Sequence, residues 1–230
     1  PDELHGNGGN DTLIGNDGAD NLYGDAGKDH LYGGKGDDYL DGGADDDTLS
    51  GGSGNNLYRL KIGGGKDIVE RDQLDSRPTT DTVLIPKSVG LENVELSREG
   101  LDIIFRIKGT QDSIRFQGAM AHEGISYNYA FQYQAEGSDP IDLNAIKQKL
   151  LHGDSNANSI IGYSTNDTLE GGAGNDLMDG GAGNNTYLFA KGDGQDVIQS
   201  FKNSALNKLN TLQFKSGVRT SDVTLTRRCS

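Results

Sequence analysis

The chain has 230 residues, of which 35 are acidic and 21 are lysine or arginine, so its formal net charge is -14. Glycine occurs 35 times, about twice its usual share, while only 33% of the residues are hydrophobic and tryptophan is absent. The negative charge argues against nucleic acid or anionic lipid as the main partner, because both would repel the chain. Burial of so little apolar surface cannot by itself offset the loss of conformational entropy on folding. Bound cations are therefore expected to supply part of the folding free energy.

Simple features of the sequence exclude further classes of structure. A disulfide framework is impossible within the chain, because Cys229 is its only cysteine. No apolar run approaches the roughly 18 residues of a transmembrane helix, and no N-terminal signal peptide is visible. The chain starts at Pro1 rather than at methionine, and we expect it to be a piece of a longer protein.

Two blocks of nine-residue repeats dominate the sequence. The first block runs without a gap from Gly6 to Arg59 and reads GNGGNDTLI, GNDGADNLY, GDAGKDHLY, GGKGDDYLD, GGADDDTLS and GGSGNNLYR. The second runs from Gly153 to Leu188 and reads GDSNANSII, GYSTNDTLE, GGAGNDLMD and GGAGNNTYL. Position one is always glycine, and position eight is always apolar or aromatic. The residues at position six are Asp11, Asp20, Asp29, Asp38, Asp47, Asn56, Asn158, Asp167, Asp176 and Asn185.

The pattern of each repeat has a physical reason. Positions seven to nine suit a short strand, in which alternation points only position eight inward. The other six residues must reverse the chain tightly, which requires positive φ and close backbone approach, and therefore glycine. Two repeats make one full turn of a coil, so each repeat stacks on the next but one, and the position-eight side chains fill a narrow core. Such a core is too thin to fold the chain alone.

This pattern resembles the calcium-binding nonapeptide G-G-x-G-x-D-x-U-x of the RTX (repeats-in-toxin, haemolysin-type) family. The resemblance implies an all-β fold of two parallel β-rolls, joined by a β-rich linker with one short helix. Calcium prefers six to eight hard oxygen ligands, which glycine-rich turns supply as carbonyls and position six supplies as carboxylates. We therefore expect several bound Ca²⁺ ions, about eight.

The resemblance also implies a ligand rule: positions two, four and six of one repeat face positions one, three and six of the next repeat but one. The facing pairs at position six would be Asp11–Asp29, Asp20–Asp38 and Asp29–Asp47. Asparagine is expected to weaken the sites at Asn56 opposite Asp38, at Asn158 opposite Asp176 and at Asn185 opposite Asp167. The expected metal ligands are Asn7, Gly9, Asp11, Asn16, Gly18, Asp20, Gly24, Asp25, Ala26, Gly27, Asp29, Gly33, Gly34, Lys35, Gly36, Asp38, Gly42, Gly43, Ala44, Asp45, Asp47, Gly51, Ser53, Asn56, Gly64, Asp67, Asp167, Gly171, Gly172, Ala173, Gly174, Asp176, Gly180, Ala182, Asp193 and Asp196.

Each block runs into a similar tail, NNLYRLKIGGGKDIVE in the first and NNTYLFAKGDGQDVIQ in the second. Both tails contain a two-residue insertion and a further near-repeat, so Asp47–Asp67 and Asp176–Asp196 are expected facing pairs. The two copies are offset by 129 residues (196 − 67), and the match extends to VELSR at 94–98 and VTLTR at 223–227. The sequence is thus one module followed by most of the next repeat block.

The segment between the blocks loses the nonapeptide and alternates like β-strands at 94–96, 102–107, 113–116 and 127–133. SDPIDLNAIKQKLL then predicts a helix, with Asp139 as N-cap, Pro140 in its first turn and Ile146 on its apolar face. The expected organisation is a first roll at 1–70, a β-rich flank at 71–137, a helical spacer at 138–152, a second roll at 153–199 and a truncated second flank at 200–230.

The sequence offers no convincing catalytic site. It contains no H-E-x-x-H, G-x-S-x-G or phosphate-binding loop. His122 and Glu123 lack a second histidine at the spacing of a metalloprotease, which favours a surface turn, and Cys229 has no neighbouring base. Asp139-Pro140 invites comparison with an RTX module that cleaves its own Asp-Pro bond, but a helix start explains the pair. We expect a binding and folding module rather than an enzyme.

The resemblance implies a function that depends on calcium. In bacterial cytosol, where calcium is scarce, the chain stays unfolded and can pass through the type I secretion machinery; outside, calcium folds it. The leading hypothesis is a secreted RTX toxin, haemolysin- or cyclase-like, that engages a host cell surface. The alternatives are a calcium-stiffened segment of a bacterial cell-surface adhesin and the C-terminal folding tail of a secreted enzyme. Interrupted blocks favour the first two over the enzyme.

Overall fold

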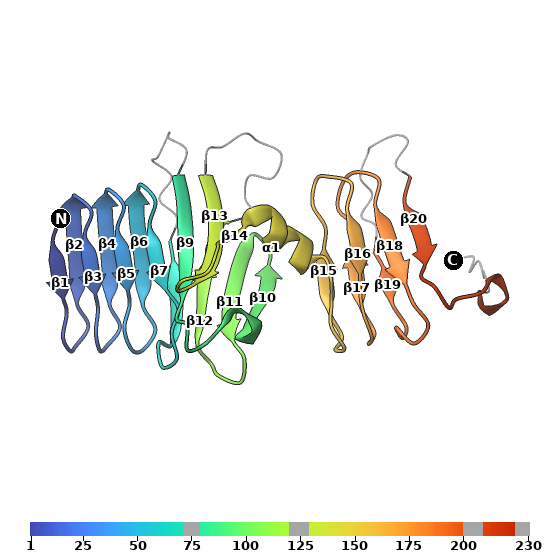
Figure 1. Cartoon of the computed structure of the whole chain (residues 1–230), viewed down its shortest axis with the longest axis horizontal. Coiled ribbons are helices and arrows are strands. Elements are labelled where there is room, and N and C mark those ends of the chain that lie inside the picture. The colour runs from blue at the N-terminus through green and yellow to red at the C-terminus, as the bar shows by residue number, and fades with distance from the viewer. Residues whose placement is uncertain (71–78, 120–128, 200–208, 224–230) are drawn as a thin grey trace. The chain divides into compact units, whose positions relative to one another are not determined.

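The structure is a computed structural model that describes residues 1–70, 79–119, 129–199 and 209–223. It confirms an all-β fold of parallel β-rolls with one short α-helix in the described ranges (Figure 1). The chain divides into two compact units, an N-terminal lobe (Pro1–Lys147) and a C-terminal lobe (Gln148–Ser230). Within the described ranges, no helix combines the length and hydropathy needed to cross a membrane.

The first roll alternates its strands between two parallel sheets (Figure 1). Leu13 pairs with Leu31 in one sheet and Leu22 with Leu40 in the other, so each repeat stacks on the next but one, as predicted. One sheet contains β1 (Glu3–His5), β3 (Asn21–Tyr23), β5 (Tyr39–Asp41) and β7 (Leu57–Arg59). The other contains β2 (Thr12–Asp17), β4 (His30–Lys35), β6 (Thr48–Ser53) and β8 (Lys66–Val69).

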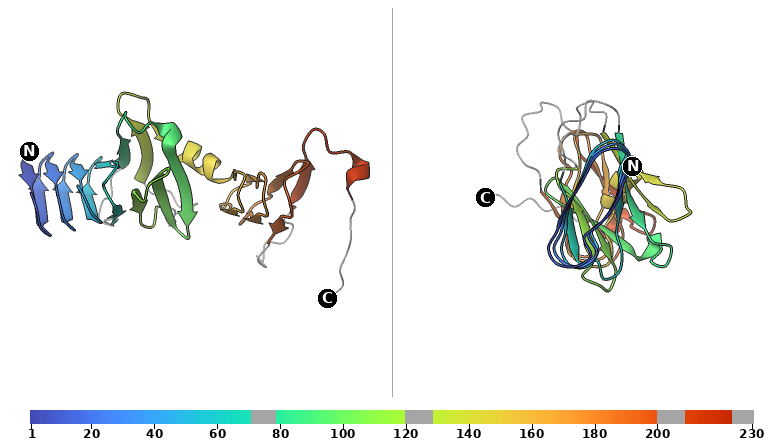
Figure 2. Two further views of the ribbon diagram at one scale, coloured as in Figure 1. Left: turned by 90° about the horizontal axis from the view of Figure 1, so that it is seen from below. Right: turned by 90° about the vertical axis from the view of Figure 1, so that its left-hand side faces the viewer.

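The core of this roll is the predicted ladder of position-eight side chains. All six of these side chains are buried, from Leu13 in the first repeat to Tyr58 in the last. Their neighbours at positions seven and nine point outward, because successive side chains of a strand face opposite sides. Seen end-on, the successive coils of the first roll superpose (Figure 2). Each coil therefore contributes two buried position-eight side chains to the interior, one from each sheet.

The flank after the first roll continues both of its sheets. In one sheet, β9 (Thr79–Ile85) pairs with β7 and with β13 (Tyr129–Ala135), and β14 (Ile141–Asp142) follows β13. In the other, β8 pairs with β12 (Ser113–Phe116), to which β11 (Asp102–Ile107) and β10 (Val94–Glu99) are added antiparallel. A 3₁₀ turn, η1 (Leu91–Asn93), precedes β10. The predicted strands at 94–96, 102–107 and 113–116 are confirmed; of the segment 127–133, residues 127 and 128 lie outside the described ranges.

The helix α1 (Leu143–Leu150) starts later than predicted. The expected N-cap at Asp139 is wrong: Asp142 holds this place, since its Oδ1 accepts the amide of Ala145 at 2.8 Å. The reason is strand pairing, because Ile141 lies opposite Tyr133 in the sheet and the chain cannot coil until this pairing ends. Ile146 is fully buried, as expected for the apolar face.

The C-terminal lobe repeats the roll with fewer coils. One sheet contains β15 (Ser159–Ile161), β17 (Leu177–Asp179) and β19 (Val197–Ile198); the other contains β16 (Thr168–Glu170), β18 (Thr186–Phe189) and β20 (Thr211–Phe214). All pairs are parallel, and the lobe ends its described part in η2 (Thr220–Asp222). The predicted flank is described only at 209–223; Cys229 and most of 223–227 lie outside the described residues, as do His122 and Glu123.

Candidate calcium centres

The turns between the strands stack in the register that the ligand rule requires. In the first block, positions two and four have positive φ, for example 67° at Asn7 and 109° at Gly9. The amide of Ala26 donates to the carbonyl of Asn7 at 3.1 Å, and the amide of Gly9 donates to the carbonyl of Ala26 at 2.9 Å. Positions two and four of one repeat therefore face position three of the next repeat but one.

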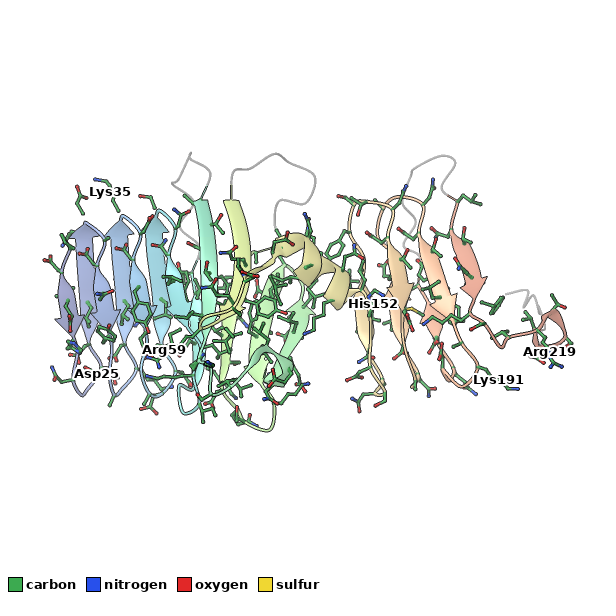
Figure 3. All side chains as sticks on the ribbon, viewed as in Figure 1. Asp25, Lys35, Arg59, His152, Lys191 and Arg219 are labelled. Carbon is green, nitrogen blue, oxygen red and sulfur yellow. The ribbon has the colours of Figure 1, made fainter. Side chains whose placement is uncertain are left out.

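The two rows of turns lie on opposite edges of the first roll. Asp25 belongs to an odd-numbered repeat and Lys35 to an even-numbered one, and their side chains mark the two edges (Figure 3). Both side chains lie at the surface: Asp25 Oδ2 accepts the amide of Asn7 at 3.1 Å, and Lys35 Nζ contacts Asp17 at 2.9 Å. The roll therefore offers two separate rows of candidate metal sites, one along each edge.

The position-six residues form hydrogen-bonded ladders, two in each roll, because each repeat bonds to the next but one. The amide of Asp11 donates to Oδ1 of Asp29 at 2.8 Å, and the amide of Asp20 donates to Oδ1 of Asp38 at 2.9 Å. Every expected facing pair is brought together in this way. The remaining pairs are Asp29–Asp47 (2.8 Å), Asp38–Asn56 (3.1 Å), Asp47–Asp67 (3.1 Å), Asn158–Asp176 (2.7 Å), Asp167–Asn185 (2.9 Å) and Asp176–Asp196 (3.0 Å).

The second carboxylate oxygen of most of these aspartates is buried and lacks a partner. Within the described part of the chain, no hydrogen-bond donor reaches this oxygen in six aspartates. A buried carboxylate oxygen can only accept, so leaving it without a donor costs free energy unless a cation or a proton satisfies it. The six atoms are Oδ2 of Asp11, Asp20, Asp29, Asp38, Asp47 and Asp176.

Each of these oxygens lies close to the position-one glycine of its own repeat. A Cβ added to Gly15 would lie 2.7 Å from Oδ2 of Asp20 and 2.6 Å from the carbonyl oxygen of Gly33. Position one therefore requires glycine, because oxygen atoms lie where the Cβ of any other residue would be. We call the space between the position-one glycine and Oδ2 of position six a cradle.

The donor set of a cradle fits calcium. Carboxylate and carbonyl oxygens are the hard ligands that Ca²⁺ takes, and the turns can supply several of them. In the described ranges, no group of three or more His, Cys, Asp or Glu side chains is placed so that the side chains alone could hold a metal ion. The arrangement therefore suits a hard cation held partly by backbone carbonyls, rather than zinc.

The second block departs from this pattern at two repeats. Both oxygens of Asp167 have local donors: the amide of Tyr163 reaches Oδ2 at 2.6 Å, and the hydroxyl of Thr165 reaches Oδ1 at 2.7 Å. Oδ1 of Asn158 accepts the amide of Asp154 at 2.8 Å. These residues stand where the rule placed them, but their oxygens already have partners.

The closing near-repeats also differ from the others. Ile62 and Lys191 occupy position one, where every full repeat has glycine. Asp193 Oδ2 accepts the amide of Ala190 at 2.5 Å. Asp67 and Asp196 still face the preceding aspartates, so they can complete the last cradle of one row in each roll.

Burial disfavours the charged form of several of these carboxyl groups. Desolvation raises the pKa of Asp47 to about 7 and the pKa of Asp67 to about 8, with neighbouring aspartates adding repulsion. Burial also raises the pKa of Asp29, Asp38 and Asp196. Burial thus opposes the charged form of these carboxyl groups, and a bound cation would favour it.

These pKa values predict how the calcium-free rolls respond to pH. The folded-state pKa values lie above the unfolded value of about 3.8, so the stabilisation is complete below that pH and is lost as the pH rises through 7 to 8. In chelator, β-structure measured by circular dichroism should therefore be greater at pH 4.5 than at pH 8.5. A gain of structure with rising pH would contradict this assignment.

Two aspartates outside the repeats support the end of the first roll and were not predicted. Asp112 Oδ2 accepts the amide of Gly63 at 3.0 Å, and its Oδ1 accepts the amide of Gly65 at 3.1 Å. Asp81 Oδ1 accepts the amide of Asn56 at 2.9 Å and so extends the position-six ladder into β9. The motif Asp-x-Val at 81–83 could have revealed Asp81, whereas Asp112 carries no sequence signal.

Comparison with known proteins agrees with this geometry. A family model described as the RTX calcium-binding nonapeptide repeat, in four copies, matches residues 1–31, 23–58 and 152–187. The matched stretches contain all six aspartates that border a cradle. No curated protein matches the chain significantly.

Proposed function

The chain carries calcium-binding nonapeptide repeats of the RTX family, and from this premise we propose that it is a module that folds by binding calcium, with one ion in each of six cradles. The observation that carries this proposal is the set of six buried carboxylate oxygens without a donor in the described chain. The proposal counts only cradles whose Oδ2 is buried without a donor, and it therefore leaves out Asp167, which has local donors.

Electrostatics links binding to folding in this proposal. Without a cation, the facing carboxylates along each row repel one another and lose their hydration on burial. The apolar core holds only two position-eight side chains in each coil, so it cannot offset this cost. Calcium bound in the cradles supplies the missing positive charge, and its binding free energy becomes folding free energy.

We further propose that the parent protein is secreted from a bacterium through the type I machinery and folds outside the cell. Calcium outside cells is near millimolar, which matches the weak affinity of extracellular calcium modules. A secreted toxin of haemolysin or cyclase type that engages a host cell surface is the leading parent. Two rolls interrupted by a flank that continues the sheets also suit a calcium-stiffened adhesin, and they suit the single tail of a secreted enzyme less well.

A calcium titration followed by far-UV circular dichroism tests the folding proposal. We expect a cooperative gain of β-signal near millimolar calcium at pH 8. Magnesium should not replace calcium, because it demands near-ideal octahedral geometry and gives up its water reluctantly. A chain already folded in chelator at pH 8, or equal responses to the two ions, would overturn the proposal.

A further inference from the structure

The last full repeat of each block combines asparagine at position six with tyrosine at position eight. These pairs are Asn56 with Tyr58 and Asn185 with Tyr187, and no other repeat has both residues. All four side chains are at most 2% exposed. The same combination therefore stands twice, 129 residues apart (185 − 56), at the point where the nonapeptides stop.

The asparagine side chain points a hydrogen-bond donor, its Nδ2 group, into the cradle of its own repeat. Oδ1 of Asn185 accepts the amide of Asp167 at 2.9 Å, so it occupies the place of the ladder oxygen and leaves Nδ2 to face the turn. There Nδ2 donates to the carbonyls of Gly180 at 2.6 Å and Ala182 at 3.0 Å. In the first block, Asn56 Oδ1 accepts the amide of Asp38 in the same way, and Nδ2 donates to Gly52 at 3.4 Å.

The tyrosine hydroxyl enters the same space from the core. Oη of Tyr58 accepts the amide of Gly51 at 3.0 Å, and Oη of Tyr187 accepts the amide of Gly180 at 3.0 Å. Tyr58 also donates to Oδ2 of Asp81 at 3.4 Å. The aspartate repeats have leucine or methionine at position eight, and these side chains offer no such group.

We propose that each Asn–Tyr pair, here called a closing rung, replaces a calcium ion with hydrogen bonds and binds no metal in its own cradle. A neutral amide that points its N–H groups at the turn carbonyls competes with a cation for the same oxygens. The phenol fills the remaining space beside the position-one glycine. This inference rests on the proposed function, because it says which cradles calcium leaves empty.

The third asparagine repeat shows that asparagine alone does not form a closing rung. Asn158 is followed by Ile160 at position eight, and its side chain bonds to Asp154 within its own turn. The two rungs lie instead on β7 and β18. Each of these strands pairs with a strand that follows the nonapeptides, β7 with β9 and β18 with β20. In the first roll, Tyr58 also packs edge-on against Phe116 of the flank, with ring centroids 5.2 Å apart. Each rung thus stands at the last full repeat of one of the two rows of its roll, after Asp38 in the first roll and after Asp167 in the second.

The test is to convert a rung into a calcium site and count the ions. In the full chain, Asn56→Asp with Tyr58→Leu restores the residues of the aspartate repeats, and equilibrium dialysis against calcium should find one more bound ion than in the wild type. Asn185→Asp with Tyr187→Leu should add another. Asn55→Asp with Tyr39→Leu is the matched control, because it makes the same chemical changes outside a cradle, and it should add none.

Two single variants keep the test decisive if a double variant fails to fold. Asn56→Ala and Tyr58→Phe should bind as many ions as the wild type, and Tyr58→Phe should lower the melting temperature of the calcium-bound form. Loss of one ion in either variant, or a folded double variant with an unchanged count, would overturn the closing rung. A wild-type chain that binds no calcium would instead overturn the proposed function on which the inference depends.

Discussion

Replacing Asp29 and Asp38 together by alanine is expected to remove two calcium ions and to raise the calcium concentration needed for folding at least about tenfold, or about 1.4 kcal/mol. The two residues stand in different rows of the first roll, and each contributes a buried Oδ2 without a donor in the described chain. Each also accepts a backbone amide through Oδ1, from Asp11 and Asp20 respectively. Alanine removes both roles, and a buried amide left without its acceptor costs about 1–3 kcal/mol.

Comparison with asparagine separates the two roles. Asp29→Asn with Asp38→Asn keeps the ladder acceptor but places N–H groups in the cradle, so two ions should again be lost while the folding midpoint rises less. The control is Glu95→Ala with Asp139→Ala, since both side chains are exposed and the loss of charge is the same. Ion counts by equilibrium dialysis and midpoints by circular dichroism are the measurements. An alanine variant that keeps every ion would contradict the site assignment.

The rolls could be predicted from sequence because their information is periodic and local. Glycine at position one, Asp or Asn at position six and an apolar residue at position eight fix the turn, the ladder and the core in every repeat. The constant spacing of nine residues then predicts which repeats stack. The structure adds the physical reason for each position. Position one needs glycine because oxygen atoms approach its α-carbon, whereas positions two and four of the first block need a residue that tolerates positive φ.

The features that were missed depend on contacts distant in sequence or on exceptions within one repeat. Asp112 reaches Gly63 and Gly65 from 49 and 47 residues away, and nothing around it marks this role. The helix start was placed too early because local capping rules do not include the pairing of Ile141 with β13. The site of Asp167 was expected to be weakened by Asn185 alone, but threonine also replaces glycine at position four of its repeat and brings a hydroxyl to the carboxylate.

Alanine at a position-one glycine is expected to be as damaging as loss of the carboxylate it faces. A Cβ on Gly24 would overlap the carbonyl oxygen of Gly42 and Oδ2 of Asp29, closer than non-bonded atoms approach. The aspartate could turn away, but the carbonyl belongs to the stacked backbone and cannot move without opening the coil. Gly24→Ala should therefore lose the ion bound by Asp29 and destabilise the calcium-bound roll by about 1–3 kcal/mol through overpacking.

Gly8→Ala provides the matched control for this prediction. Gly8 lies in the same row of turns at position three, where the following repeats already have Ala26 and Ala44. An added Cβ there would have the carbonyl oxygen of Ala26 as its nearest neighbour, at 4.0 Å, which is ordinary contact. The control should keep both the ion count and the melting temperature of the wild type. Equal behaviour of the two variants would mean that glycine is present for chain flexibility alone, and the cradle would lose its main geometric support.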